Sequence, residues 1–140
     1  MNRAKEIARA YLIESEVDFE ISRILYQNGF NSRTVFSAQQ ASEKVVKACL
    51  ALKGIYTTDH NLSSIFINVY GDQIPEIDRI ANAITELERH GTRSRFPLYH
   101  RPNLPIWIPS RDYTVDDAMN CLANLEFIFK TLKDFLDNKL

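Results

Sequence analysis

Apolar residues recur at every third or fourth position along several stretches of the chain, the spacing of helices with one buried face. No stretch alternates apolar and polar residues for long enough to predict a strand. We expect four long helices and one short one: about residues 3–28, from a Ser32 cap to Lys53, a short one from about Asn61 to Tyr70, one from Pro75, and one after a Thr114 cap. The pattern predicts an all-α fold, an up-and-down four-helix bundle with a short extra helix, formed as a single domain over residues 1–140.

The positions of glycine and proline indicate where the predicted helices end and where a long loop lies. Each of the four glycines follows a periodic stretch, and glycine is favoured just past a helix end because it adopts the left-handed conformation at little cost. They are Gly29, Gly54, Gly71 and Gly91. Four of the five prolines lie between residues 92 and 112, so we expect a long Pro-rich loop without regular helix before the last helix. Trp107 in that loop should dock onto its own chain or onto a partner.

Composition excludes several classes of protein. The chain is 45% apolar and 25% charged, as globular domains are, and no apolar run approaches the ~20 residues that cross a bilayer. The charged N-terminal residues argue against a secretory signal. Cys49 and Cys121 lie within amphipathic patterns and have no neighbouring histidine, so we expect reduced core thiols in a cytoplasmic protein. We expect no membrane association, no metal site and no cofactor.

The distribution of charge is more informative than the net charge of −1. Five arginines and two histidines lie between Arg89 and Arg111, and that segment contains no Asp or Glu. All 18 acidic residues therefore lie elsewhere, together with 12 of the 17 lysines and arginines. A cationic segment on an acidic body can attract an anion such as a phosphate. The arginines could equally keep a loop hydrated or pair with acids on the body.

Three short motifs occur in a fixed order. Gln39-Gln40-Ala41-Ser42-Glu43-Lys44 lies in the second predicted helix, His60-Asn61-Leu62 follows it, and Arg95-Phe96-Pro97 comes after the fourth. This set resembles prokaryotic members of the HEPN family, the higher eukaryotes and prokaryotes nucleotide-binding domain. Their pattern is Gln-Gln-Ala-x-Glu-Lys, then His-x-Leu, then Arg-Tyr-Pro or a close variant. Further matches are Asp18 and Asn28-Gly29-Phe30, and the resemblance spans about residues 4 to 136.

The resemblance implies a bundle of four or five helices, usually a homodimer, that is associated with nucleotides or RNA. Some members of the family are toxins or RNases, and many act beside a minimal nucleotidyltransferase partner. For Glu43, Lys44 and His60, a polar structural network or a dimer seam is the simpler interpretation. For Trp107, an apolar anchor is simpler than a platform for a nucleobase.

Catalytic members of the family carry Arg-x(4–6)-His, and this chain offers Arg95 and His100 with four residues between them. Arg93 matches the same histidine with six residues between them. Histidine can move a proton near neutral pH, and arginine presents a fork of donors to phosphate oxygens. Active members usually place a small polar residue after the arginine, whereas here Phe96-Pro97 follows.

The candidate catalytic pair is therefore Arg95 and His100. The candidate phosphate-binding set is Arg93, Arg95 and His100, with Lys44 or Lys47 reaching the same cleft. Three functions remain open: a nucleotide- or RNA-binding module that does not cleave, a metal-independent RNase of the toxin type, and a structural partner of another protein.

Overall fold

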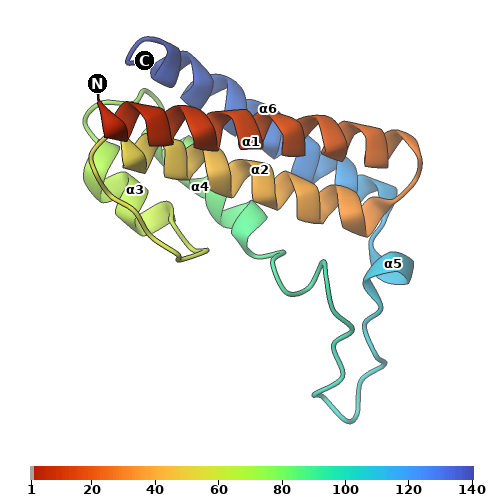
Figure 1. Cartoon of the computed structure of the whole chain (residues 1–140). Coiled ribbons are helices and arrows are strands. Elements are labelled where there is room, and N and C mark those ends of the chain that lie inside the picture. Colours follow the sequence, from red (N-terminus) through yellow and green to blue (C-terminus); the bar gives the residue numbers. More distant parts are fainter. Residues whose placement is uncertain (1) are drawn as a thin grey trace.

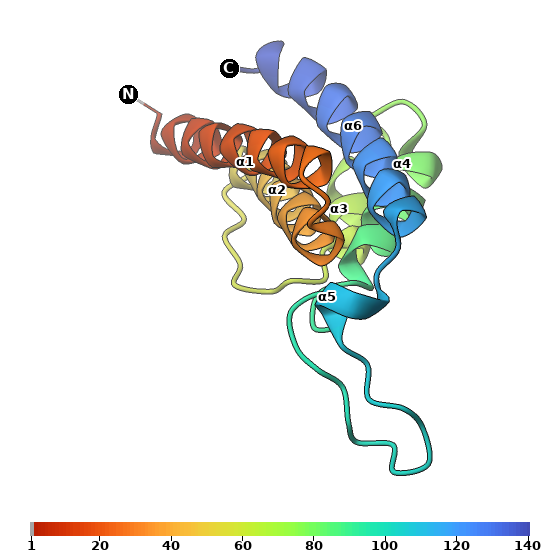
Figure 2. The same cartoon turned by 90° about the vertical axis from the view of Figure 1, so that its right-hand side faces the viewer.

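The computed structural model describes residues 2–140, and it confirms the all-α prediction. Its helices are α1 (Arg3–Gln27), α2 (Asn31–Ala51), α3 (Ser63–Tyr70), α4 (Ile77–Glu88), α5 (Pro109–Asp112) and α6 (Val115–Asp137). Within the described residues, β-type pairing is limited to one isolated antiparallel bridge between Leu98 and Trp107. Four long helices form the bundle, and the segment between α4 and α5 extends away from it as a long loop (Figures 1 and 2).

Helix α2 lies at the centre of the bundle. It runs antiparallel beside α1 and also contacts α3, α4, α5 and α6. Small residues on α2, including the fully buried Ala38 and Ala41, let α1 approach closely. Two buried α1 hydroxyls then bond to the α2 backbone: Ser15 Oγ donates to the carbonyl of Ala41 at 2.6 Å, and Ser22 Oγ to that of Thr34 at 2.9 Å. These contacts fix the helix that carries the Gln-Gln-Ala motif.

A helix ends shortly before each of the four glycines, as predicted, and two of the four take the left-handed conformation. Gly29 and Gly54 have φ of 79° and 71°, the left-handed conformation that lets the chain leave α1 and α2. Gly71 follows α3 but remains right-handed, with φ of −52°. Gly91 lies beyond the end of α4, in a run of turns that continues to residue 95. The predicted helix ends are therefore confirmed, whereas the left-handed conformation that we gave as their reason is found at Gly29 and Gly54 and not at Gly71 or Gly91.

Several boundaries differ from the sequence prediction. Helix α2 starts at Asn31, so Ser32 lies in its first turn and does not cap it. Helix α4 starts at Ile77 rather than at Pro75. The Pro-rich segment does contain helix, because Pro109 occupies the first position of the single turn α5, where its missing N–H costs nothing. The Thr114 cap of α6 is confirmed as a reciprocal capping box with Asp117.

The Pro-rich loop is tied to its own chain through Trp107. Its indole Nε1 donates to the backbone carbonyl of Arg93 at 2.8 Å, and its ring packs edge-on against Tyr113 at 5.1 Å between centroids.

Cys49 and Cys121 are buried free thiols, and burial raises the pKa of Cys121 to about 12. None of the helices described between residues 2 and 140 is both long and apolar enough to span a bilayer.

Candidate functional site

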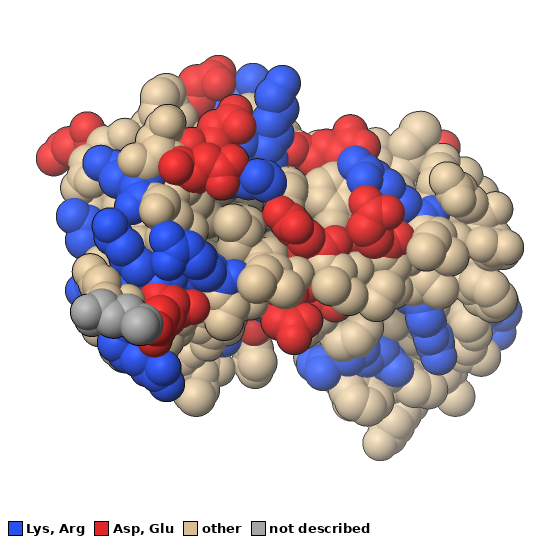
Figure 3. Space-filling view, turned by 45° about the horizontal axis from the view of Figure 1, so that its top comes forward, with Lys and Arg blue, Asp and Glu red and all other residues tan. Residues whose placement is uncertain are grey.

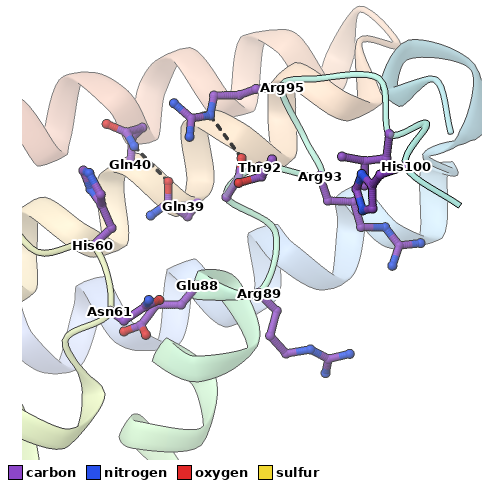
Figure 4. Close-up of a pocket in the computed structure, with 12 residues that line it drawn as sticks. Gln39, Gln40, His60, Asn61, Glu88, Arg89, Thr92, Arg93, Arg95 and His100 are labelled. Atoms are coloured by element: carbon purple, nitrogen blue, oxygen red, sulfur yellow. Dashed lines mark hydrogen bonds between the residues drawn. The ribbon is translucent and has the colours of Figure 1, made fainter.

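A cavity of about 510 Å³ opens where the Pro-rich loop leaves the bundle. Residues from α2, from the turn before α3, from the end of α4 and from the first half of the loop surround it (Figure 4). They are Gln39, Gln40, His60, Asn61, Glu88, Arg89, Gly91, Thr92, Arg93, Arg95, Leu98 and His100. The cavity thus combines residues that lie up to about sixty positions apart in the sequence, and most of them are polar or cationic.

Three arginines are among the residues that line this cavity: Arg89, Arg93 and Arg95. Among its described lining residues, Glu88 carries the one carboxylate, and that group is already engaged. Its Oε1 accepts hydrogen bonds from the backbone N–H groups of Leu62 and Ser63, at 2.9 and 3.2 Å, at the start of α3. Burial raises the pKa of Glu88, and the two hydrogen bonds partly oppose this rise. Glu88 therefore anchors the turn before α3. Arg89 is paired with Glu86, with 2.9 Å between its Nη1 and Oε1. Among the described residues, no acidic side chain forms an ion pair with Arg93 or Arg95.

Arg95 lies against α2. Its Nε donates to the carbonyl of Gly91 at 3.1 Å, and its guanidinium carbon lies 5.3 Å from the ring centroid of Phe36 on that helix. Figure 4 shows its side chain directed toward the part of the cavity where Gln40 and His60 lie. His100 lies with Arg93 on the other side of the same cavity.

Arg93 links this cavity to a second one. Its guanidinium carbon lies 4.2 Å from the centroid of the Trp107 ring, which holds the side chain over the base of the loop. The adjoining cavity, of about 370 Å³, shares Arg93, Leu98 and His100 with the first and adds Arg101 and the indole of Trp107. The arginine-rich surface is therefore continuous from α2 to the tip of the loop.

Beside the cavity, a chain of hydrogen bonds runs along α2. Gln40 Nε2 donates to Gln39 Oε1 at 2.8 Å, and Gln39 Nε2 donates to Glu43 Oε1 at 3.2 Å. The same Oε1 lies 3.0 Å from Nδ1 of His60, while Oε2 accepts from Nζ of Lys47 at 3.2 Å. The Glu43 side chain is 8% exposed, so a nearly buried carboxylate collects donors from one helix and one loop.

The residues expected from sequence fall into two groups. Arg93, Arg95 and His100 line the same cavity. Lys44 instead pairs with Asp18 of α1, with 2.5 Å between Nζ and Oδ2, and Lys47 pairs with Glu43; neither lysine is among the lining residues. Sequence reasoning did not assign Gln39, Gln40, Asn61, Glu88 and Arg89 to the site, although the first three lie within or beside the motifs that it noted.

A separate basic cavity lies at the far end of the bundle. It has about 300 Å³ and is lined by Lys5, Lys53 and Lys139 together with Tyr70 and Phe135, with no Asp or Glu among its described lining residues. Figure 3 shows basic side chains gathered at the end where α1 begins, while acidic ones cross the middle of that face. The body that carries the loop is therefore not uniformly acidic.

Between residues 2 and 140 no three His, Cys, Asp or Glu side chains cluster as a metal site would require.

Fold and site together define a small helical-bundle protein with an arginine-rich cavity beside a polar network on its central helix. The model of the HEPN domain family matches residues 8–135 of the chain. The chain belongs to the HEPN domain family, and the resemblance found in its motifs is confirmed.

Known relatives agree with this assignment. The chain is 32% identical over 136 residues to the protein named "Putative toxin MJ1304" of Methanocaldococcus jannaschii, a match that covers 94% of this chain and 90% of the relative. Two crystal structures share the fold. ST0689, described as an archaeal HEPN homologue, matches with a TM-score of 0.72 and 24% identity over 97% of this chain and 99% of its own. TT1696 of Thermus thermophilus matches with a TM-score of 0.77 and 21% identity over 96% and 98%.

Proposed function

We propose that the chain binds a nucleotide or an RNA strand through its phosphates, in the cavity between α2 and the Pro-rich loop. The observation that supports this most is that Arg93 and Arg95 line one cavity whose carboxylate, Glu88, is engaged by backbone amides, while the neighbouring Arg89 is paired with Glu86. Guanidinium groups present a planar fork of donors that fits phosphate oxygens. Gln40 and Asn61 offer further hydrogen bonds to a sugar or a base.

The biological setting belongs to the same proposal. The M. jannaschii relative carries the name "Putative toxin MJ1304", and by analogy we propose that this chain acts in the cytoplasm as one half of a toxin–antitoxin pair. Its partner would be a minimal nucleotidyltransferase, as the family resemblance implies. Co-purification of the chain with a co-expressed nucleotidyltransferase would support this setting, and the absence of any complex would count against it.

Binding is tested by fluorescence anisotropy with a labelled single-stranded RNA. Changing Arg93→Ala together with Arg95→Ala removes two charges from the cavity and should abolish most of the affinity. The matched control is Lys53→Ala together with Lys139→Ala, which removes two charges from the other basic cavity and should change little. Affinity should also fall steeply as salt rises, because phosphate binding releases counterions. If the lysine pair rather than the arginine pair abolishes binding, the RNA binds in the lysine-lined cavity and the proposed site is wrong.

Cleavage of RNA without a metal ion is a second candidate, because Arg95 and His100 line one cavity. They lie on different sides of it, so the reaction requires one phosphodiester to reach both side chains. In such a reaction the ribose 2′-oxygen attacks the adjacent phosphorus and His100 takes its proton. The bond from phosphorus to the 5′-oxygen breaks, and that oxygen takes a proton from water. The products are a 2′,3′-cyclic phosphate and a 5′-hydroxyl, and Arg95 holds the phosphate oxygens as negative charge builds on them.

The cleavage candidate is tested by incubating purified protein with RNA in the presence of a metal chelator. The His100→Ala variant should lose about 10²-fold in rate or more, because a positioned general base is worth at least that much. The Arg95→Lys variant should also be slow, because a point charge does not reproduce the fork of a guanidinium. If both variants cleave as the unaltered protein does, this pair does not carry the reaction.

A further inference from the structure

His60 combines two features that are unusual in a surface histidine. Its side chain is 76% exposed, yet one ring nitrogen is held by Glu43, whose side chain is only 8% exposed. The distance from His60 Nδ1 to Glu43 Oε1 is 3.0 Å. The turn that carries His60 is in turn held by Glu88 through the N–H groups of Leu62 and Ser63. The imidazole is therefore positioned from two directions while its other edge remains open to the cavity.

The surroundings of Glu43 determine which nitrogen of the ring carries the proton. Lys47 and Gln39 both donate to this carboxylate, so it acts as an acceptor in the network. His60 Nδ1 must then be the donor of the third contact. In a neutral imidazole with its proton on Nδ1, Nε2 is left with a lone pair and accepts hydrogen bonds. In that tautomer, the network along α2 presents one acceptor to a cavity that otherwise offers mainly donors.

A purely structural role explains this arrangement less well. Lys47 already supplies a cation to Glu43, and Gln39 supplies a further hydrogen bond, so the carboxylate does not need His60 to be satisfied. The exposed ring also adds little packing to the core. What His60 adds is an oriented acceptor, in the part of the cavity toward which Arg95 points (Figure 4).

We propose that Nε2 of His60, positioned by Glu43, accepts a hydrogen bond from a ribose 2′-hydroxyl whose neighbouring phosphate is held by Arg95. The 2′-hydroxyl sits on the sugar carbon next to the one that carries the phosphate, so it is the donor that an acceptor beside a guanidinium would meet. Because DNA lacks this hydroxyl, the cavity selects RNA over DNA. The inference rests on the proposed RNA-binding function and specifies the chemistry of its ligand.

The test compares three labelled oligonucleotides of one sequence: oligouridylate, oligodeoxyuridylate, and oligouridylate with 2′-O-methyl groups. The unaltered protein should bind the ribose form about five-fold more tightly than the other two, the factor expected for one neutral hydrogen bond. All three oligonucleotides are measured in the same buffer. Equal affinity for all three would overturn the inference while leaving phosphate binding intact. Absence of binding to any of them would overturn both this inference and the proposed function.

Two substitutions of His60 separate recognition from structure. His60→Asn keeps a donor near the position of Nδ1, and therefore the contact with Glu43, but has nothing at the position of Nε2. It should fold with an unchanged melting temperature and lose the preference for ribose. His60→Ala should lose the same preference. If His60→Asn retains the preference, the hydroxyl is recognised by another residue and the inference is wrong.

Glu43 is a positioning residue, and its role is read from the ring itself. Long-range ¹H–¹⁵N spectra should show the neutral His60 ring with its proton on Nδ1 in the unaltered protein. In Glu43→Gln this preference should weaken, because a carboxamide can donate as well as accept, and the preference for ribose should fall with it. If that variant fails to fold, the spectrum of the unaltered protein still decides: a proton on Nε2 overturns the inference.

Discussion

At the scale of single residues, His90 couples the stability of the fold to pH. Its Nδ1 lies 2.8 Å from the hydroxyl of Tyr113, and the ring is half-buried behind the base of the loop. Burial lowers the pKa of His90, and the nearby guanidinium groups of Arg93 and Arg89 lower it further. Asp117 and Glu86 act in the opposite direction and do not cancel the effect. The folded protein therefore disfavours the protonated form of this imidazole.

This shift has a definite sign. In the unfolded chain His90 takes up its proton near pH ~6.5, while the folded state resists protonation until a lower pH. The contribution of His90 to the free energy of unfolding should therefore be complete above pH ~6.5. It should decline as the pH falls from there toward the lower pKa of the folded state. Urea unfolding at about pH 7.5 and about pH 5.5 measures the decline. His90→Gln should flatten it, whereas the same change at the exposed His100 should not; an unchanged decline in His90→Gln would contradict the argument.

Part of the candidate site could be predicted from the sequence alone. The acid-free cluster of arginines was enough to find Arg93, Arg95 and His100, because they lie within a few residues of one another. Lys44 and Lys47 were expected to reach the same cleft, but helical spacing does not reveal which neighbour covers each face, and α1 offers Asp18 to Lys44. The contact between Glu43 and His60 joins a helix to a loop, and local pattern does not predict such a contact.

At the scale of elements, the start of α6 depends on its capping box. The Thr114 hydroxyl accepts from the backbone N–H of Asp117 at 3.1 Å, and the Asp117 carboxylate accepts from the N–H of Thr114 at 2.9 Å. Two donors of the first turn are thereby satisfied, directly after the Tyr113 that packs against Trp107. The cap therefore fixes both the helix and the end of the Pro-rich loop.

Thr114→Ala should lower the free energy of unfolding by about 1 kcal/mol, the usual value of an N-cap. Denaturant unfolding monitored by circular dichroism measures the loss. Asp116→Ala, in the same first turn but outside the box, is the matched control and should cost less. A loss at Asp116 equal to that at Thr114 would mean that general charge at the helix start matters more than the cap.

Helices with a clear helical period and capping residues were predicted well, and helices without these local signals were not. The helical period and the capping sequence located the long helices, since both are local signals. The start of α4 and the single turn α5 were missed, because Glu76 adopts a left-handed conformation and Pro109 opens a helix where prolines suggested none. At these places the surrounding fold overrides local preference.

At the scale of the whole molecule, we expect two copies of the chain to associate. Trp107, which prompted this expectation, docks on its own chain, but several apolar neighbours in the loop remain exposed: Phe96, Tyr99, Leu104 and Ile106. Covering such side chains with a second copy would remove apolar surface from water. The loop is therefore the surface where we expect the dimer to form.

Light scattering at micromolar concentration should return about twice the chain mass of 16.2 kDa. Leu104→Glu together with Ile106→Glu should shift the protein to a single copy, because each change places a charge in the proposed interface. Ile13→Glu together with Val17→Glu, on the exposed face of α1, serves as the comparison. Dissociation by the α1 pair alone would place the interface on that helix, and a single copy in the unaltered protein would exclude the dimer.

The bridge between Leu98 and Trp107 has a consequence for how this protein can diversify. Their backbones exchange hydrogen bonds at 3.0 and 3.1 Å, so the chain between them leaves and returns at one point. The entropy of closing a loop changes slowly with its length, by about 0.6 kcal/mol for each doubling. The length of the tip can therefore change with little effect on the bundle, provided that His100, which lies inside this segment and lines the cavity, keeps its place. The fold thus constrains the length of the tip only weakly, and the constraint on its residues comes from the cavities that they line.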